Sequence, residues 1–328
     1  MLPDILPMRP FLRELVWGGQ RLETRYGKPL PPGKPIGESW EVSAYPGMSS
    51  VVTSGPQARR PLGDLVRDHG EDLLGARLHD RSGGDFPLLI KLLDAQDDLS
   101  VQVHPDDRYV LEQRLGDCGK SEAWYILHSE GGRVCTGLED GVDGAEMRAA
   151  IQEGRVGEVL RFHEVHAGDV IAIPPGTVHA VCRGVMLYEI QQPSDLTFRI
   201  YDYDRPGPDG RPRELHTDRA LDVIAFDTEA PAPRPWHELP NATDSRALLA
   251  ETEYFRLERH GLAGASSTLD SGGSFAAITL LSGEAELRGG NASHPASAGD
   301  SFVIPSSREI EIARRSDARL EYLVASVP

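Results

Sequence analysis

The chain has 328 residues and a mass of 35.8 kDa, and its 34 basic and 51 acidic side chains give a formal net charge of −17. This length allows two domains, and the acidic excess argues against binding to nucleic acids or anionic membranes, which require a basic surface. The three cysteines are too few for a disulfide scaffold. We therefore expect a cytoplasmic protein without nucleic-acid or membrane partners.

The first part of the chain predicts short strands interrupted by one helix. Residues 1–60 are rich in glycine and proline, and apolar residues at helical spacing then predict a helix over 61–77. Between residues 86 and 136 the pattern becomes strand-like, with short apolar or alternating runs at 88–93, 100–104 and 122–127.

The second part predicts a small helical insertion followed by more strands. Residues 143–162 show helical spacing on both sides of Gly154, which predicts two short helices, the first capped by Asp143. Strands are expected again over 165–204. A proline-rich stretch at 226–245 is the best linker, and the rest is strand and turn. We expect a catalytic domain over 1–225, the linker 226–245, and a second β domain over 246–328.

An internal repeat indicates that the two β domains are related. The segments Gly168–Pro174 and Gly299–Pro305 share a Gly-Asp turn, an apolar strand and a closing proline. The repeat predicts two related sandwich or small-barrel units. His179 of the first copy aligns with Ile310 of the second, so any site that uses this histidine belongs to the first unit alone.

Four polar residues in the first unit could hold a metal ion. Gln102 and His104 are two positions apart on a predicted strand, so their side chains leave one face while valines leave the other. Glu122 and His179 add a carboxylate and a second imidazole. Two histidines and one carboxylate suit catalytic Zn²⁺ and also non-haem Fe²⁺. The alternative is that these residues form an exposed polar stripe and a structural histidine.

Further charged residues accompany this set. Arg199 lies on an apolar strand, where it needs either a ligand or an ion pair, for example with Asp202. The other candidates stand in strand or turn contexts and could equally be solvated or structural: Lys34, Lys91, Lys120 and Glu189.

Several separated motifs resemble one enzyme family. The segments QVHPDD (102–107), GKSEAW (119–124) and PPGTVHA (174–180), with WGG at 17–19 and GESWE at 37–41, resemble type I mannose-6-phosphate isomerases. The similarity extends from about residue 8 to about residue 205 and is weaker in the C-terminal unit. The chain lacks the large helical domain of longer members and looks like the short bacterial form.

The resemblance implies a fold, a cofactor and a reaction. The implied fold is mainly β, with two cupin (jelly-roll) units in tandem and a small helical insertion. The implied ligands of one Zn²⁺ per chain are His104, Glu122 and His179, with Gln102 as the fourth. The implied active-site residues are Arg199, Lys120 and Glu189. The implied reaction interconverts the sugar phosphates mannose 6-phosphate and fructose 6-phosphate through an enediol, with Lys120, Glu189 or a metal-bound water as the base.

Two other functions use the same residues. An Fe(II) cupin dioxygenase would bind its metal with two histidines and a carboxylate, although Gln102, Lys120 and Arg199 argue against it. A non-enzymatic sugar-binding cupin is the other alternative, and the loss of ligands in the second unit makes it worth testing. We expect a monomer or a small homo-oligomer, with Lys34 and Lys91 as candidates for binding phosphate.

Overall fold

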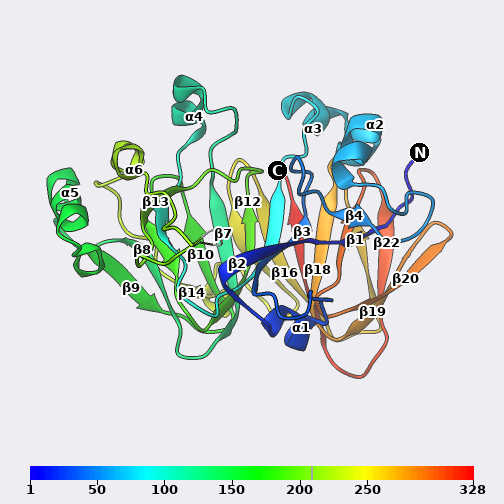
Figure 1. Cartoon of the computed structure of the whole chain (residues 1–328). Helices are drawn as coiled ribbons and strands as arrows, with labels where there is room; N and C mark the ends of the chain where they lie inside the picture. The colour runs from blue at the N-terminus through cyan, green and yellow to red at the C-terminus, as the bar shows by residue number, and fades with distance from the viewer. Residues whose placement is uncertain (208–209) are drawn as a thin grey trace.

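In the computed structural model, which describes residues 1–207 and 210–328, the chain forms two β sandwiches side by side (Figure 1). Each sandwich has one seven-stranded sheet and one smaller sheet, and every strand pair assigned among the described residues is antiparallel. This is the mainly β, tandem jelly-roll architecture expected from the sequence.

The first sandwich contains the motifs named above. Its larger sheet has the order β14-β10-β7-β12-β5-β3-β2 and its smaller sheet the order β13-β6-β11-β8-β9. The strands of the larger sheet are β2 (Phe11–Gly19), β3 (Ile36–Val42), β5 (Leu89–Asp94), β7 (Glu122–Ser129), β10 (Asp169–Ile173), β12 (Val185–Gln191) and β14 (Arg234–Pro235). Those of the smaller sheet are β6 (Val101–Val103), β8 (Arg133–Leu138), β9 (Leu160–Glu164), β11 (His179–Val181) and β13 (Phe198–Tyr201).

The second sandwich has the same plan. Its larger sheet has the order β15-β16-β23-β18-β21-β1-β4 and its smaller sheet the order β17-β22-β19-β20. The larger sheet consists of β1 (Leu6–Arg9), β4 (Val51–Val52), β15 (Arg246–Glu251), β16 (Arg256–Leu262), β18 (Ala276–Ser282), β21 (Ser301–Ile304) and β23 (Leu320–Ser326). The smaller consists of β17 (Ser266–Asp270), β19 (Glu284–Gly289), β20 (Ala292–Ser297) and β22 (Glu309–Arg314).

The two sandwiches exchange strands. β1 and β4, from the start of the chain, lie at the edge of the second sandwich, where Leu6 pairs with Val303. In return β14, from the expected linker, pairs with β10 of the first sandwich. The boundaries predicted at residues 225 and 245 remain a prediction, and the exchange means that neither sandwich is built from one continuous segment.

A buried ion pair also joins the two sandwiches. Lys28 donates a hydrogen bond to Glu41 at 2.7 Å, and the same carboxylate accepts one from Ser301 of β21 at 2.9 Å. Both Lys28 and Glu41 are buried. A buried charge that loses its partner destabilises a protein strongly, so this contact fixes the relative position of the two units.

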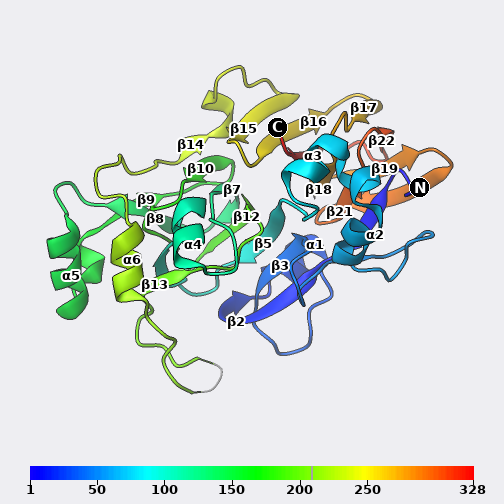
Figure 2. The ribbon, with the colours of Figure 1, turned by 90° about the horizontal axis from the view of Figure 1, so that it is seen from above.

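The helices are short and lie at the ends and flanks of the sandwiches. They are α1 (Arg21–Tyr26), α2 (Leu62–Leu74), α3 (Ala76–Arg81), α4 (Asp107–Gln113), α5 (Gly144–Gln152), α6 (Thr217–Val223) and two 3₁₀ turns, η1 (Val156–Glu158) and η2 (Trp236–Glu238). Seen from above, α5 and α6 flank the first sandwich, and α2 and α3 lie against the second (Figure 2). None of the helices in the described ranges is both long and apolar enough to cross a membrane.

The predicted helices are confirmed in part. The helix expected over 61–77 is present as α2, and α5 begins as expected, because the Asp143 side chain accepts hydrogen bonds from the amides of residues 145 and 146. The prediction of a second helix within residues 143–162 is wrong. Only the single turn η1 forms, and Leu160 already begins strand β9, whose residues pair with β8.

Candidate metal centre and active-site cleft

Three neighbouring strands of the smaller sheet bring polar side chains to one face. Gln102 of β6 is the register partner of His179 on β11 and of Arg199 on β13. Directly opposed residues of antiparallel strands point to the same side of the sheet. The predicted strand alternation is therefore confirmed here, since Val101 and Val103 are buried in the core on the other face.

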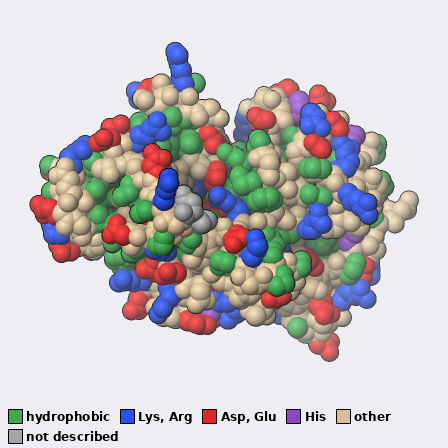
Figure 3. Space-filling view, viewed as in Figure 1, with side chains coloured by type: hydrophobic (Ala, Val, Ile, Leu, Met, Phe, Trp, Pro, Cys, Tyr) green, Lys and Arg blue, Asp and Glu red, His purple; other side chains and the backbone are tan. Residues whose placement is uncertain are grey.

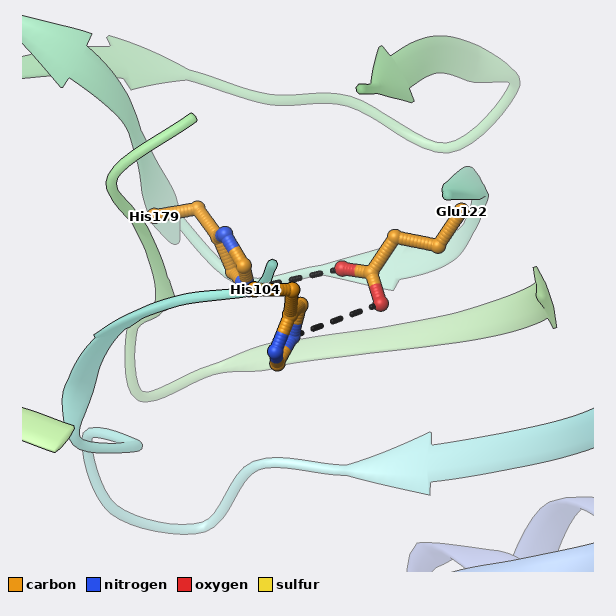
Figure 4. A group of neighbouring side chains, drawn as sticks. All are labelled: His104, Glu122 and His179. Carbon is orange, nitrogen blue, oxygen red and sulfur yellow. Dashed lines mark ion pairs between the residues drawn. The ribbon is translucent and has the colours of Figure 1, made fainter. Parts of the chain in front are cut away.

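His104, Glu122 and His179 meet between the two sheets of the first sandwich (Figure 4). The Nε2 atom of His104 lies 3.7 Å from Oε2 of Glu122, and Nε2 of His179 lies 3.4 Å from Oε1 of the same carboxylate. One potential ligand atom from each residue lies within 4.8 Å of the others. All three side chains are only 1 % exposed.

The donor atoms of this cluster fit a metal ion. His179 donates a hydrogen bond from Nδ1 to the carbonyl of Thr177 at 2.9 Å, which leaves the lone pair of Nε2, 3.4 Å from Oε1 of Glu122, as the atom that a metal would bind. Both ring nitrogens of His104 and both carboxylate oxygens of Glu122 are buried and lack a hydrogen bond of ordinary geometry, although Lys120 lies 3.4 Å from one oxygen of Glu122. Buried polar atoms are normally satisfied, so a cation that these atoms coordinate would account for them.

The electrostatics of the cluster also favour metal ligation. Burial lowers the pKa of His179 to about 4 and holds the pKa of His104 well below its usual value, to which the nearby Lys120 adds. Burial and the charge of Glu189 raise the pKa of Glu122. Neutral imidazoles are the form that binds metals, and a cation would favour the ionised carboxylate of Glu122.

Gln102 lies beside this cluster. Its side-chain Nε2 is 3.2 Å from Nε2 of His179, and Ser100 donates to its Oε1 at 3.4 Å. The two ends of a glutamine amide are interchangeable by rotation, and rotation would direct the oxygen at the cluster. The position is therefore compatible with a fourth, neutral ligand.

A second row of side chains, on the larger sheet, faces the row formed by Gln102, His179 and Arg199 on the smaller sheet. Glu189 of β12 is the register partner of Trp124 on β7 and of Lys91 on β5. Its Oε1 accepts from Lys91 at 2.9 Å and its Oε2 accepts from the Trp124 indole at 3.0 Å. Burial opposes the ionisation of Glu189, but the charges of Lys91 and Lys120 and these two hydrogen bonds hold its pKa below the usual value.

Lys120 lies in the loop immediately before β7. Its Nζ atom is 3.4 Å from Oε2 of Glu122, and the residue is 4 % exposed. Lys120 therefore contacts the metal-capable cluster and also borders the space between the two rows of side chains.

A cleft of about 210 Å³ opens between the rows. Lys120, Glu189, Arg199 and Gln102 line it, whereas the three members of the cluster lie behind these side chains. Its charged lining consists of the basic residues Arg13, Lys91, Lys120, Arg199 and Arg213 and the acidic residues Glu38, Glu189 and Asp195. A protein with an overall negative charge thus has a locally basic cleft.

Arg199 makes no ion pair with any described carboxylate. Its guanidinium donates to the carbonyl of Glu214 at 2.9 Å and to the Ser100 hydroxyl at 3.4 Å. Asp202, the partner considered from the sequence, is instead bound by Arg213 and Arg205. Arg199 is therefore available to an anionic ligand in the cleft.

Lys91 and Lys34, the two lysines that the sequence suggested for binding phosphate, lie in different surroundings. Lys91 lines the cleft but is paired with Glu189, and Lys34 is an exposed residue paired with Glu14 that does not line the cleft. Arg13 and Arg213 were missed, because each is an isolated basic residue whose place in the cleft depends on the fold. In the cleft, Arg13 pairs with Asp195 at 3.0 Å.

The second sandwich carries apolar residues where the first has ligands. Glu122 pairs with Ile173, and in the repeat the matching Ile304 pairs with Ala276. Likewise Gln102 pairs with His179, whereas Leu269 pairs with Ile310. The three equivalent residues, Leu269, Ala276 and Ile310, are buried in one apolar cluster. This arrangement agrees with the prediction that only the first unit holds a ligand set.

Two family models match the chain. The catalytic domain of phosphomannose isomerase type I matches residues 5–132, and the cupin domain of mannose-6-phosphate isomerase matches residues 245–313.

Relatives and a solved structure match nearly the whole chain. It is 33% identical over 296 residues to mannose-6-phosphate isomerase of Streptococcus mutans, which covers 90% of each chain. It is 34% identical over 308 residues to the isomerase ManA of Bacillus subtilis, covering 93% of this chain and 94% of the relative. The crystal structure of a Bacillus subtilis mannose 6-phosphate isomerase superposes with a TM-score of 0.87 at 30% identity, covering 98% and 99% of the two chains. The chain therefore belongs to the type I mannose-6-phosphate isomerase family, with the cupin architecture of that family.

Proposed function

We propose that this protein interconverts mannose 6-phosphate and fructose 6-phosphate and that it binds Zn²⁺ through His104, Glu122 and His179, with Gln102 as the fourth ligand. The observation that carries the proposal is the buried cluster of two imidazoles and a carboxylate beside a basic cleft, in a member of this isomerase family. When bound, Zn²⁺ would polarise the sugar oxygens and stabilise negative charge that develops on them.

The reaction requires a group that moves a proton between C2 and C1 of the sugar. Lys120 and Glu189 both line the cleft. Both oxygens of Glu189 already accept hydrogen bonds, from Lys91 and Trp124, and its lowered pKa makes it a weak base. We therefore assign proton removal from C2 and its return to C1 to the neutral amine form of Lys120, which becomes an ammonium in the first step and an amine again in the second. Glu189 holds Lys91 and the indole in place and accepts hydrogen bonds at the edge of the cleft.

Arg199 supplies the positive charge for the reacting or anionic part of the substrate. Its guanidinium has no carboxylate partner among the described residues, so it can bind an enediolate or a phosphate through two parallel hydrogen bonds. The remaining surface charge matters little, because at physiological salt charges more than about 8 Å away are largely screened. The basic lining of the cleft therefore suits one sugar phosphate even though the protein as a whole is acidic.

A coupled assay tests the proposal directly. Purified protein is assayed for fructose 6-phosphate formed from mannose 6-phosphate, before and after a chelator, and after separate reloading with Zn²⁺, Fe²⁺ or Mn²⁺. We expect turnover that the chelator abolishes and Zn²⁺ restores. Absence of turnover in the zinc-loaded protein would reject the isomerase, and oxygen consumption by the iron-loaded protein would favour a dioxygenase.

We also place the protein in the cytoplasm. All three cysteines are free thiols, and two of them, Cys135 and Cys182, are buried. Burial raises the pKa of both thiols, which keeps them unreactive. Fractionation of cells that express the tagged protein tests the placement.

A further inference from the structure

The loop that carries Lys120 is anchored at three consecutive backbone amides. Gly119 donates to Oδ1 of Asp107 at 2.7 Å, Lys120 donates to the carbonyl of Pro105 at 3.0 Å, and Ser121 donates to Oε1 of Gln192 at 2.9 Å. Because each amide has a different acceptor, the backbone of Lys120 is held from both sides.

The acceptors are themselves connected. The side-chain amide of Gln192 donates to the carboxylate of Asp107, at 3.1 Å from one oxygen and 3.3 Å from the other. Gly119 packs directly against the start of α4, where a Cβ atom would lie only 2.5 Å from the Asp107 amide nitrogen. The loop therefore follows the position of Asp107 closely.

The second sandwich contributes the last member of this chain of contacts. Tyr254, in the turn between β15 and β16, donates its hydroxyl to Oδ2 of Asp107 at 2.7 Å. Its ring packs against the buried core that the two sandwiches share. Tyr254 and Asp107 line a second cleft, visible in Figure 3 as the notch between the lobe with α4 and the lobe with α2 and α3, and neither lines the cleft beside the metal centre.

We propose that Asp107 and Tyr254 are positioning residues for Lys120, so that the second sandwich, whose positions equivalent to the ligand set are apolar, holds a catalytic side chain of the first in place. This inference rests on the proposed function, because it takes Lys120 as the group that moves the proton. Neither residue needs to touch the substrate. Their loss should therefore lower kcat with little effect on KM, since displacement of a reacting group by about 1 Å costs on the order of 100-fold in rate.

Three variants in the metal-loaded protein test the positioning. Asp107→Ala removes the acceptor of both Gly119 and Tyr254, and we expect kcat to fall about 10- to 100-fold with KM within about twofold. Tyr254→Phe keeps the ring and removes one hydrogen bond, so a severalfold loss of kcat is expected. Asp107→Asn keeps one acceptor oxygen for Gly119, so its kcat should lie between that of the wild type and that of Asp107→Ala.

The matched control is Tyr109→Phe. Tyr109 also donates to an aspartate, Asp222, at 3.3 Å, so this bond ties its hydroxyl to α6 and not to the acceptors of the Lys120 loop. This variant should keep the wild-type kcat and the wild-type exchange pattern described next.

Amide hydrogen exchange separates this inference from the proposed function. Exchange of the peptide that contains residues 119–121 should accelerate in Asp107→Ala and Tyr254→Phe, whether or not the protein turns over mannose 6-phosphate.

Loss of kcat together with faster exchange supports the inference. Unchanged exchange rejects the positioning, as does unchanged kcat in an active wild-type background. An inactive wild type rejects the proposed function instead and leaves exchange to decide the positioning. If Asp107→Ala does not fold, Asp107→Asn and Tyr254→Phe decide.

Discussion

Lys91 donates a hydrogen bond to Glu189 at 2.9 Å, and both side chains are at least 95 % buried. Two opposite charges are therefore fixed at the wall of the cleft, where water reaches neither of them freely.

Removing one partner of this pair should be costly. Lys91→Met removes the ion-pair partner of a buried carboxylate that keeps only its hydrogen bond from Trp124, and we expect the free energy of unfolding to fall by about 3–5 kcal/mol. The control is Lys34→Met, because Lys34 and Glu14 form a pair at 2.6 Å in which both side chains are about half exposed, and its loss should cost about 1 kcal/mol or less. Urea unfolding of the two variants makes the comparison, and equal losses would contradict the buried pair.

The same pair predicts a pH dependence. A carboxyl whose pKa is lower in the folded than in the unfolded state, as for Glu189, contributes stability that is present above the unfolded pKa and lost as the pH falls through the folded value. In Lys91→Met the buried Glu189 has lost that partner and takes up a proton at higher pH. The stability difference between wild type and variant should therefore be largest at pH 7 and smaller at pH 4. Urea midpoints of chelator-treated protein at both pH values measure it, and a difference that grows on acidification would reject the assignment.

Loss of a single ligand should remove the metal without unfolding the protein. We expect His104→Ala to bind no metal and to lose activity while its circular dichroism stays that of the wild type. His163→Ala, a histidine of β9 outside the cluster, should keep its metal. Metal content by atomic emission is the measurement. Full metal stoichiometry in His104→Ala would reject this residue as a ligand.

Arg199 should act on the substrate and not on the metal. Lysine lacks the planar fork of the guanidinium, so Arg199→Lys should lower kcat/KM by about 10²- to 10³-fold with unchanged metal content. Arg161→Lys is a suitable control, because Arg161 forms only exposed contacts with acidic residues. Steady-state kinetics and metal analysis of both variants test the role, and loss of metal in Arg199→Lys would indicate a structural effect.

The second sandwich should not regain a metal site through one substitution. Ile310→His places an imidazole opposite Leu269, within a buried apolar cluster. We expect lower stability, because a buried polar group without a partner costs about 1–3 kcal/mol, and still one metal per chain. Thermal unfolding and metal titration check both, and a second bound metal would show that ligands from elsewhere can reach this site.

Strand alternation is a local property, so the sequence alone predicted that Gln102 and His104 share a face, whereas the complete ligand set was implied by the family resemblance. Gln102 and His104 are two positions apart, and the repeat identified His179 as the residue that the second unit lacks. Whether Arg199 binds a ligand or forms an ion pair could not be predicted from neighbouring residues in the sequence. It depended on Arg205 and Arg213 occupying Asp202, which only the folded chain shows.

Some other helices and strands differ from the prediction, either because the sequence carries no local pattern for them or because such a pattern was not used. Helix α4 falls in a region expected to be strand, although Asp106 caps it by accepting from the Tyr109 amide, and an aspartate before a helical run is a recognisable start. Residues 160–162, the start of strand β9, are predicted as helix because their apolar spacing continues that of α5 past Gly154. No periodicity could have shown that the four residues of β1 pair with β21, almost at the other end of the chain.

The position of β1 has a consequence for synthesis on the ribosome. Leu6 emerges among the first residues, but its partner Val303 is translated nearly 300 residues later. At a synthesis rate of roughly 5–20 residues per second, β21 is completed on the order of tens of seconds after β1. During this time an unpaired apolar edge is open to wrong partners. The enzyme should therefore depend on chaperones in the cell more than its short chain length suggests.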